Sequence, residues 1–362
     1  MLWLAVAAAC ACAAAAILVN ERLRQRREQA KAYLKGVRSM LAGNPDAAIE
    51  ALSDAARLAS PEAYDTYLAL GALFRREGDL ARAIRLHRNI LLRPDLAASR
   101  RDEVERELAA DYRRGGMLEE AEASYRALAE RGDREGTVGL RDVLVEKGDL
   151  TGAAEVQRVL AGGAEDGLLA HLDAALARRA LERGEPARLL AERAVAAGPG
   201  SADALLALAE VEAREGGAAQ ALALAARALD GAPQAALLAW PALAGAAGAA
   251  LPFVEARLEA RPGEAALWLL RARLLLSAGR SAEALPSLAR ALEEDRSGEV
   301  TIAMRELLRE AAPPPPEELA ARHDLMRAAL LRHAHPLRCA RCGAATPLRA
   351  WRCPRCGAFD CY

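Results

Sequence analysis

A glycine recurs in the same local setting along most of this 362-residue chain. The clearest copy reads Leu70-Gly71-x-x-Phe74-x-x-x-Gly78-Asp79-Leu80-x-x-Ala83. A glycine with an alanine five residues later occurs at Gly43, Gly78, Gly116, Gly148, Gly216 and Gly279, and Gly184 is a weaker member of the series. Two antiparallel helices joined by a short turn need such a glycine, because the backbone becomes left-handed where the first helix ends. One pair cannot bury its apolar face alone, so the pattern predicts stacked helix pairs.

The period identifies the kind of repeat. Successive glycines in the series are 35, 38, 32, 36, 32 and 63 residues apart, and the last interval holds one degenerate unit that contains Trp240 and Phe253. This period and pattern resemble the tetratricopeptide repeat over roughly residues 29–296. The abundance of alanine and leucine, with only 4% aromatic residues, favours helix. We therefore expect an all-α tetratricopeptide-repeat superhelix, and another helical solenoid is the alternative.

Side-chain size along the repeats agrees with close helix packing. Small residues let paired helices approach, as at Gly36, Gly71 and Ala83, and larger ones fill the space between units, as at Tyr33, Phe74 and Tyr125. The first helices of such units form the concave face. In two consecutive units this face should carry Asp65, Leu68, Ala72 and Arg75, then Glu103, Arg106, Ala110 and Arg113. Arg75, Arg106 and Arg113 are candidate partner contacts, and a merely solvated face is the alternative for each.

The N-terminus predicts a membrane anchor. Residues 2–19 carry no charge, and as a helix they would span about 27 Å, enough for a bilayer core. Four arginines follow within residues 22–27, and no lysine or arginine precedes the apolar run. A cleaved signal peptide would carry its positive charge before the run. We expect a single-pass transmembrane helix over 1–20, a basic juxtamembrane segment over 21–28, and the bulk of the protein in the cytoplasm.

Prolines divide the C-terminal part of the chain. The repeat array is expected over 29–312, because no helix continues through the proline linker at 313–316. An amphipathic helix is expected over 317–335, with one apolar side made of Leu319, His323, Met326 and Leu330. A tetracysteine module then occupies 336–362.

Two C-x-x-C-G sequences near the C-terminus predict a metal site. They place four thiolates at Cys339, Cys342, Cys353 and Cys356, with ten residues between the second and third cysteines, and no cysteine occurs between Cys12 and Cys339. Each sequence is a knuckle that aims two sulfurs at one point, and two knuckles supply a tetrahedral site for one structural ion. Iron is the alternative metal, and rubredoxins bind iron between two knuckles of this kind. The knuckles of rubredoxins are separated by a much longer, aromatic-rich segment, so we favour zinc here. Cys361 is expected to be a bystander, and His333 and His335 are minor candidates as ligands.

The module carries five arginines but few aromatic residues. The arginines are Arg338, Arg341, Arg349, Arg352 and Arg355. Trp351 and Phe359 are the module's only Trp and Phe residues, so we expect a solvated or protein-facing surface and no nucleic acid. A knuckle pair this small cannot bury both rings by itself, so we expect the module to dock on the repeats, and Trp351 is a candidate partner contact.

Anchor, repeats and knuckles, in this order, resemble the lipopolysaccharide assembly protein B family. The segments that carry the resemblance are Tyr33-Leu-Lys-Gly36-Val37, Leu70-Gly71-Ala-Leu-Phe74-Arg75, Arg82-Ala83-Ile84-Arg85, Asp111-Tyr112 with Gly116 and Ala121-Glu122, and Trp351-x-Cys353-Pro354-x-Cys356. The resemblance implies an inner-membrane adaptor with a rubredoxin-like metal domain. It implies that the adaptor couples a membrane-bound ATP-dependent protease to the deacetylase that commits precursors to lipid A, and so limits lipopolysaccharide synthesis.

Other classes of function are less consistent with the sequence. We find no phosphate loop and no nucleophile motif, and four sulfurs leave no open metal position, so we expect no enzyme. The rivals are a generic repeat scaffold with an iron-containing electron-transfer module, or one with an RNA-binding module. The sequence does not decide whether the chain forms a homodimer.

Overall fold

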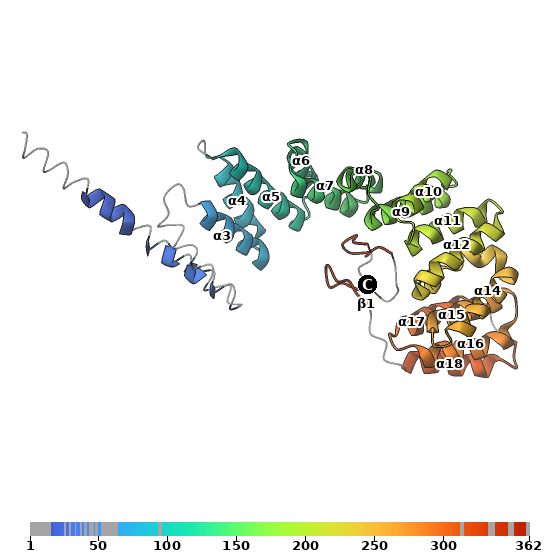
Figure 1. Ribbon diagram of the computed structural model, residues 1–362. Helices are drawn as coiled ribbons and strands as arrows, with labels where there is room; N and C mark the ends of the chain where they lie inside the picture. The colour runs from blue at the N-terminus through green and yellow to red at the C-terminus, as the bar shows by residue number, and fades with distance from the viewer. Residues whose placement is uncertain are drawn as a thin grey trace, which may run out of the picture. The chain divides into compact units, whose positions relative to one another are not determined.

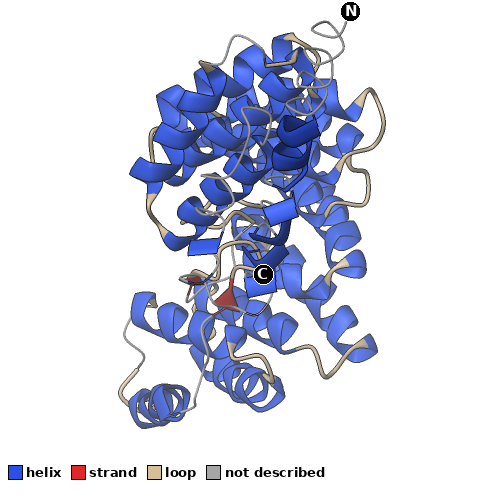
Figure 2. Ribbon diagram, turned by 90° about the vertical axis from the view of Figure 1, so that its left-hand side faces the viewer, coloured by secondary structure: helices blue, strands red, loops and turns tan. Residues whose placement is uncertain are grey.

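The computed structural model describes residues 16–24, 27–28, 30–32, 34–36, 38–39, 42, 47, 50–51, 64–92, 96–311, 315–331, 337–346 and 351–359. Among these residues the chain is helical almost throughout, and its two strands belong to the C-terminal module (Figure 2). The chain divides into two compact units, Met1–Val143 and Leu144–Tyr362. Most of the expected anchor over 1–20 and Gly43 lie outside the described residues, as do Pro313, Cys361, His333 and His335. No helix within the described residues is both long and apolar enough to cross a bilayer.

The first unit contains helix pairs in sequence order (Figure 1). Its helices from residue 64 onward are α3 (Tyr64–Glu77), α4 (Leu80–Leu91), α5 (Ala98–Arg114), α6 (Leu118–Glu130) and most of α7 (Arg134–Lys147). Tyr125 of α6 packs its ring against Gly139 of α7, where a Cβ atom would come within 2.4 Å of the ring. This contact between successive pairs agrees with the predicted role of Tyr125 as a filler between units.

The second unit continues the same pairing. Its helices are α8 (Leu150–Ala161), α9 (Gly167–Arg183), α10 (Arg188–Ala197), α11 (Ala202–Arg214), α12 (Ala218–Gly231), η1 (Pro233–Leu238), α13 (Trp240–Leu243), η2 (Ala244–Ala246), α14 (Ala247–Ala260), α15 (Ala265–Ser277), α16 (Ser281–Glu294), α17 (Glu299–Glu310) and α18 (Leu319–Leu331). The degenerate repeat is the stretch from η1 to α14. Its first helix is broken into short pieces, two of which contain a proline in their first turn, at Pro233 and Pro241.

The repeat glycines adopt the predicted left-handed backbone. The six described members of the series have φ between 70° and 87°. The residue after each glycine donates its N–H to a carbonyl five residues earlier, for example Asp79 to Phe74 and Asp149 to Leu144, at 2.8 and 2.9 Å. These bonds satisfy carbonyls at the end of the first helix. The alanine five residues after the glycine is fully buried at Ala83, Ala121, Ala153, Ala221 and Ala284. The all-α tetratricopeptide-like architecture is therefore confirmed.

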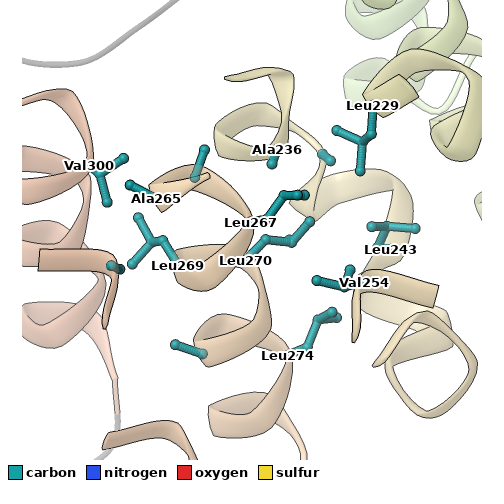
Figure 3. Packing of buried hydrophobic residues seen from close by; sticks show 14 of the residues in the cluster. Leu229, Ala236, Leu243, Val254, Ala265, Leu267, Leu269, Leu270, Leu274 and Val300 are labelled. Atoms are coloured by element: carbon teal, nitrogen blue, oxygen red, sulfur yellow. The ribbon is translucent and has the colours of Figure 1, made fainter. Parts of the chain in front are cut away.

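The largest apolar cluster lies in the second unit. Figure 3 shows part of it, where Leu267, Leu270 and Leu274 of α15 meet Leu229 and Val254 from neighbouring helices. The predicted helix over 317–335 is α18, and it packs on this cluster through Leu325, Met326 and Ala329.

The predicted apolar side of this last helix is wrong in part. Of its four residues only Met326 packs on the cluster, whereas Leu319 and Leu330 are mostly exposed. Two reciprocal hydrogen bonds explain why α18 turns a different side toward the cluster than the one predicted. Arg322 of α18 donates to Leu308 O near the end of α17, and Arg305 of α17 donates to Ala329 O near the end of α18. These bonds satisfy helix-terminal carbonyls that a spacing pattern does not reveal.

Candidate metal centre

The two knuckles have the same local structure, fourteen residues apart. Cys339 N–H donates to Ala344 O and Gly343 N–H to Cys339 O, at 3.0 and 2.8 Å. The equivalent bonds of the second knuckle, Cys353 to Ala358 and Gly357 to Cys353, are 2.7 and 2.9 Å long. Each knuckle therefore closes as the same tight turn.

Short strands and positive-φ glycines hold the two turns. Strand β1 (Leu337–Arg338) pairs antiparallel with β2 (Ala345–Thr346) around the first knuckle, and a single bridge between Arg352 and Phe359 closes the second. Gly343 and Gly357 have φ of 67° and 70°, a conformation that side chains rarely adopt. The sequence C-x-x-C-G thus fixes the direction of all four thiols.

The four thiol sulfurs gather at one point. The sulfurs of Cys339, Cys342, Cys353 and Cys356 all lie within 4.8 Å of one another, and Cys339 and Cys353 are buried. The distance from Cys339 Sγ to Cys356 Sγ is 3.6 Å, and that from Cys342 Sγ to Cys353 Sγ is 3.8 Å. A tetrahedral ion with bonds of about 2.3 Å requires sulfur–sulfur distances of about 3.8 Å. The four residues therefore fit a single ion, and zinc and iron both suit this donor set.

The protein environment disfavours free thiolates at this point. Burial, and then contact with the other thiols, raises the pKa of Cys356 to about 12, although the backbone N–H of Ala358 opposes the shift. Thiols must lose their protons to bind a metal, so an ion would supply the positive charge that the cluster lacks.

Aromatic stacking docks the module on the repeats. The imidazole of His171 in α9 lies 5.6 Å from the ring of Phe359, with the planes at 15°, and 5.9 Å from the ring of Trp351. His171 Nδ1 faces Asp203 Oδ2 of α11 at 2.5 Å, and Arg178 Nη1 donates to the other oxygen of this carboxylate. A buried ion-pair network thus orients the ring on which the module stacks.

The end of α7 supplies a second docking point. Arg352 Nη2 donates to Val145 O in the last turn of α7, and Arg352 Nε donates to Gly357 O. A Cβ atom on Gly357 would come within 2.8 Å of the Val145 side chain. Burial, and then the nearby Arg179, lowers the pKa of Arg352. The predicted docking of the module on the repeats is therefore confirmed.

A groove lies beside the docked module. It has a volume of about 690 Å³ and is lined by Trp351 together with residues of α9, α11 and the broken repeat. The lining is Arg178, Leu181, Glu182, Glu210, Ala213, Arg214, Leu238, Pro241, Ala244, Gly245 and Trp351. Arg178 and Glu210 pair with each other at 2.9 Å, and burial raises the pKa of Glu210. The metal module therefore forms one wall of the groove.

The three predicted contact arginines of the repeats pair within the chain. Arg75 pairs with Glu107 and Asp111 at 2.7 and 2.8 Å. Arg113 pairs with Asp142 at 3.1 Å, and Arg106 pairs with Asp133. Each pair joins one helix pair to the next, so these side chains connect successive repeats. Their role as partner contacts stays a prediction.

Comparison with known proteins supports the family resemblance over part of the chain. No family model matches the chain. A segment of 104 residues is 28% identical to "Lipopolysaccharide assembly protein B" of Escherichia coli strain K12, and proteins of the same description from Escherichia coli O157:H7 and strain CFT073 match equally. The match covers 29% of this chain and 26% of the K12 protein, so it spans about a quarter of the length of these relatives.

Solved structures of repeat proteins are also similar to the chain. The TPR2AB domain of yeast Sti1 in complex with a pHSP90 is 14% identical, covers 83% of this chain and 98% of that one, and has a TM-score of 0.30. A tetratricopeptide repeat protein from Parabacteroides merdae is 14% identical, covers 84% of this chain and 99% of that one, and has a TM-score of 0.33.

Proposed function

We propose that the chain is an adaptor scaffold whose repeats and docked metal module together form a binding surface for other proteins. The observation that carries the proposal is the groove beside Trp351, because residues of the repeats and a residue of the docked module line it together. Most of its lining residues are apolar, and the lining also includes charged groups such as the exposed Glu182 and Arg214. Apolar floors with a few polar groups are typical of sites that hold peptide side chains.

The finer function follows the resemblance to lipopolysaccharide assembly protein B. The adaptor would hold the deacetylase that commits precursors to lipid A and present it to a membrane-bound ATP-dependent protease. The matched segment and the helix pairs support this proposal. Holding both proteins on one scaffold raises their effective concentration for each other without any new contact.

Attachment to the inner membrane is part of the proposal. The uncharged run over 2–19 and the arginines behind it support the attachment. The last residues of the run lie in a described helix, where Ile17, Leu18 and Val19 are 57–68% exposed. Large apolar side chains exposed in a row are costly in water and favourable in lipid. Carbonate-washed membranes should retain the full chain, and recovery of the chain in the soluble fraction would refute the anchor.

The groove can be tested with one exposed residue. Ala244→Glu adds a charge to the groove at an exposed position, and Ala218→Glu adds the same charge at an exposed position in the first turn of α12. Each tagged variant would be isolated from native membranes, and the co-purifying proteins quantified by mass spectrometry. We expect Ala244→Glu to lose most of the deacetylase and Ala218→Glu to keep it. Equal recovery of deacetylase by both variants would refute the groove as its site.

A further inference from the structure

Charge is unevenly divided between the end of the chain and the rest. Residues 325–359 contain seven arginines and no Asp or Glu, a formal charge of +7. The other 327 residues contain 42 Lys and Arg and all 50 Asp and Glu, a formal charge of −8. A zinc tetrathiolate would contribute about −2, from four thiolates and one divalent ion. The stretch therefore stays strongly positive with the metal bound.

The two knuckles use equivalent arginines for different purposes. Both read Arg-Cys-x-Arg-Cys-Gly, and both first arginines donate to the carbonyl of their own knuckle's glycine. Arg352 of the second knuckle also reaches Val145 O and is half-buried against the repeats. Its counterpart Arg338 is exposed, as are Arg341 and Arg355. We call Arg338, Arg341 and Arg355 the outer arginine face.

The surroundings of this face indicate its partner. The exposed neighbours Ala340, Gly343, Ala345 and Pro354 are small, so the backbone of the first knuckle is accessible. In the part of the module that the structure describes, the sheet consists of the two-residue strands β1 and β2, in which the exposed residues Arg338 and Ala345 are paired. Extended peptide segments commonly bind proteins beside short strands of this kind. Guanidinium groups bind carboxylates through two parallel hydrogen bonds.

Nucleic acid fits the module less well. Single-stranded RNA binds proteins largely through aromatic rings that stack on its bases. The two aromatic rings of the described module, Trp351 and Phe359, stack on His171 of the repeats. Within the described residues, the exposed face of the module offers charge and backbone without a further aromatic ring.

We propose that the outer arginine face binds an acidic, extended segment of a partner protein. This contact lies on the module and is separate from the groove lined by Ala244 and Trp351. Exposed ion pairs are individually weak, but three of them together strengthen binding by about tenfold and make it sensitive to salt.

The test uses the full chain in neutral detergent and a fluorescein-labelled peptide of eight glutamates. The test variant is Arg338→Gln/Arg341→Gln/Arg355→Gln. The control variant, Arg126→Gln/Arg280→Gln/Arg290→Gln, removes three exposed arginines whose salt bridges stay within their own helix or its first turn. Fluorescence anisotropy would measure Kd at low and physiological salt, and metal content and circular dichroism would verify the fold of each variant.

We expect the test variant to bind the peptide at least tenfold more weakly than the wild type, and the control variant to stay within about twofold. High salt should weaken peptide binding by the wild type and by the control variant alike, and should weaken the residual binding of the test variant much less. The proposal is wrong if the wild type does not bind the peptide or if both variants lose binding equally. It is also wrong if labelled oligouridylate binds the face more tightly than the peptide, because the partner would then be RNA.

Discussion

The ring of His171 in the repeats stacks on the ring of Phe359 in the metal module, with the planes at 15° and the centroids 5.6 Å apart. The two residues are 188 positions apart in the sequence. The contact joins a scaffold built from local helix pairs to a module built from local knuckles. The same histidine contacts Trp351, which lines the groove, so a change at His171 should loosen the docking of residues 351–359 on the repeats.

His171→Ala should loosen the docked module. The substitution removes the stacking surface for Phe359 and Trp351, and aromatic pairs contribute about 0.5–1.5 kcal/mol beyond their burial. Amides of residues 351–359 should exchange hydrogen faster by roughly three- to tenfold, measured by mass spectrometry with metal bound. His323→Ala, at an exposed position of α18, should leave that exchange unchanged. Identical exchange in both variants would show that the stack does not hold the module.

Gly71→Ala should strongly destabilise the first helix pairs. A Cβ atom at this position would lie 2.2 Å from Nε2 of His87, a side chain that is fully buried and held by Asp111 at 2.6 Å. Because the ring cannot retreat, we expect a loss of about 2–4 kcal/mol in the free energy of unfolding. In the matched control, Gly248→Ala in α14, the Cβ meets nothing within 4 Å, and alanine favours helix by up to about 1 kcal/mol. Urea denaturation would compare the two, and equal stability would contradict the prediction.

Arg75→Gln should cost stability even though the residue was predicted to contact a partner. Its guanidinium pairs with Asp111, whose side chain is fully buried, so the substitution leaves a buried carboxylate with His87 alone. We expect a loss of about 1–3 kcal/mol in the free energy of unfolding. Arg76→Gln, on the exposed side of the same helix, should change it by less than about 0.5 kcal/mol. A stable Arg75→Gln protein that fails only in partner binding would instead support a contact role.

Asp173→Asn should flatten part of the pH dependence of stability. Burial raises the pKa of Asp173, and Arg158 opposes the shift only in part. An acid whose pKa is raised on folding binds its proton more tightly in the folded state. Wild-type stability from this group therefore increases as pH falls through the raised pKa towards the ordinary value near 4. The amide of the variant cannot titrate, so the variant's stability advantage over the wild type should be largest at pH 7 and should shrink by pH 4. Urea denaturation at both pH values measures this, and an advantage that grows on acidification would contradict it.

Local patterns in the sequence predicted local structure well. The turns within helix pairs could be predicted from Gly78, Gly116 and Gly148, because each turn needs a residue with a left-handed backbone. This need does not depend on the rest of the chain. The four cysteines also predicted the metal site, since each knuckle is formed by only five consecutive residues.

Long-range relationships were not predictable in the same way. Arg352 meets Val145, 207 residues away, and no spacing rule connects them. His171 and Asp203 lie in positions that any repeat helix could fill with other residues, so their role as the docking surface became visible only in three dimensions. A histidine near the start of an alanine-rich helix was the one available indication. The ion pairs of the repeat arginines were also not predictable, because a concave position does not tell whether the next repeat supplies an acid.

Removal of two metal ligands tests how the module serves the scaffold. Cys353→Ser/Cys356→Ser should abolish metal binding, because two sulfurs cannot replace four, and the second knuckle with Arg352 and Gly357 should then leave the end of α7. The repeats should stay helical by circular dichroism, since their turns close through backbone bonds of their own. Metal analysis of the wild type should give one zinc ion per chain, whereas a red, iron-loaded protein would favour electron transfer.

Loss of the groove wall formed by Trp351 should change the cellular level of the deacetylase in the Cys353→Ser/Cys356→Ser variant. Without a docked Trp351 the deacetylase should no longer be presented to the protease, so its level in cells should rise several-fold. Cys10→Ser/Cys12→Ser provides a matched control with two cysteines replaced outside the module, and it should keep deacetylase levels normal. Normal levels in the Cys353→Ser/Cys356→Ser variant, with metal absent and helices intact, would show that the module is dispensable for adaptor function. Raised levels with intact helices would instead make the bound ion a requirement of the binding surface and separate that requirement from folding of the repeats.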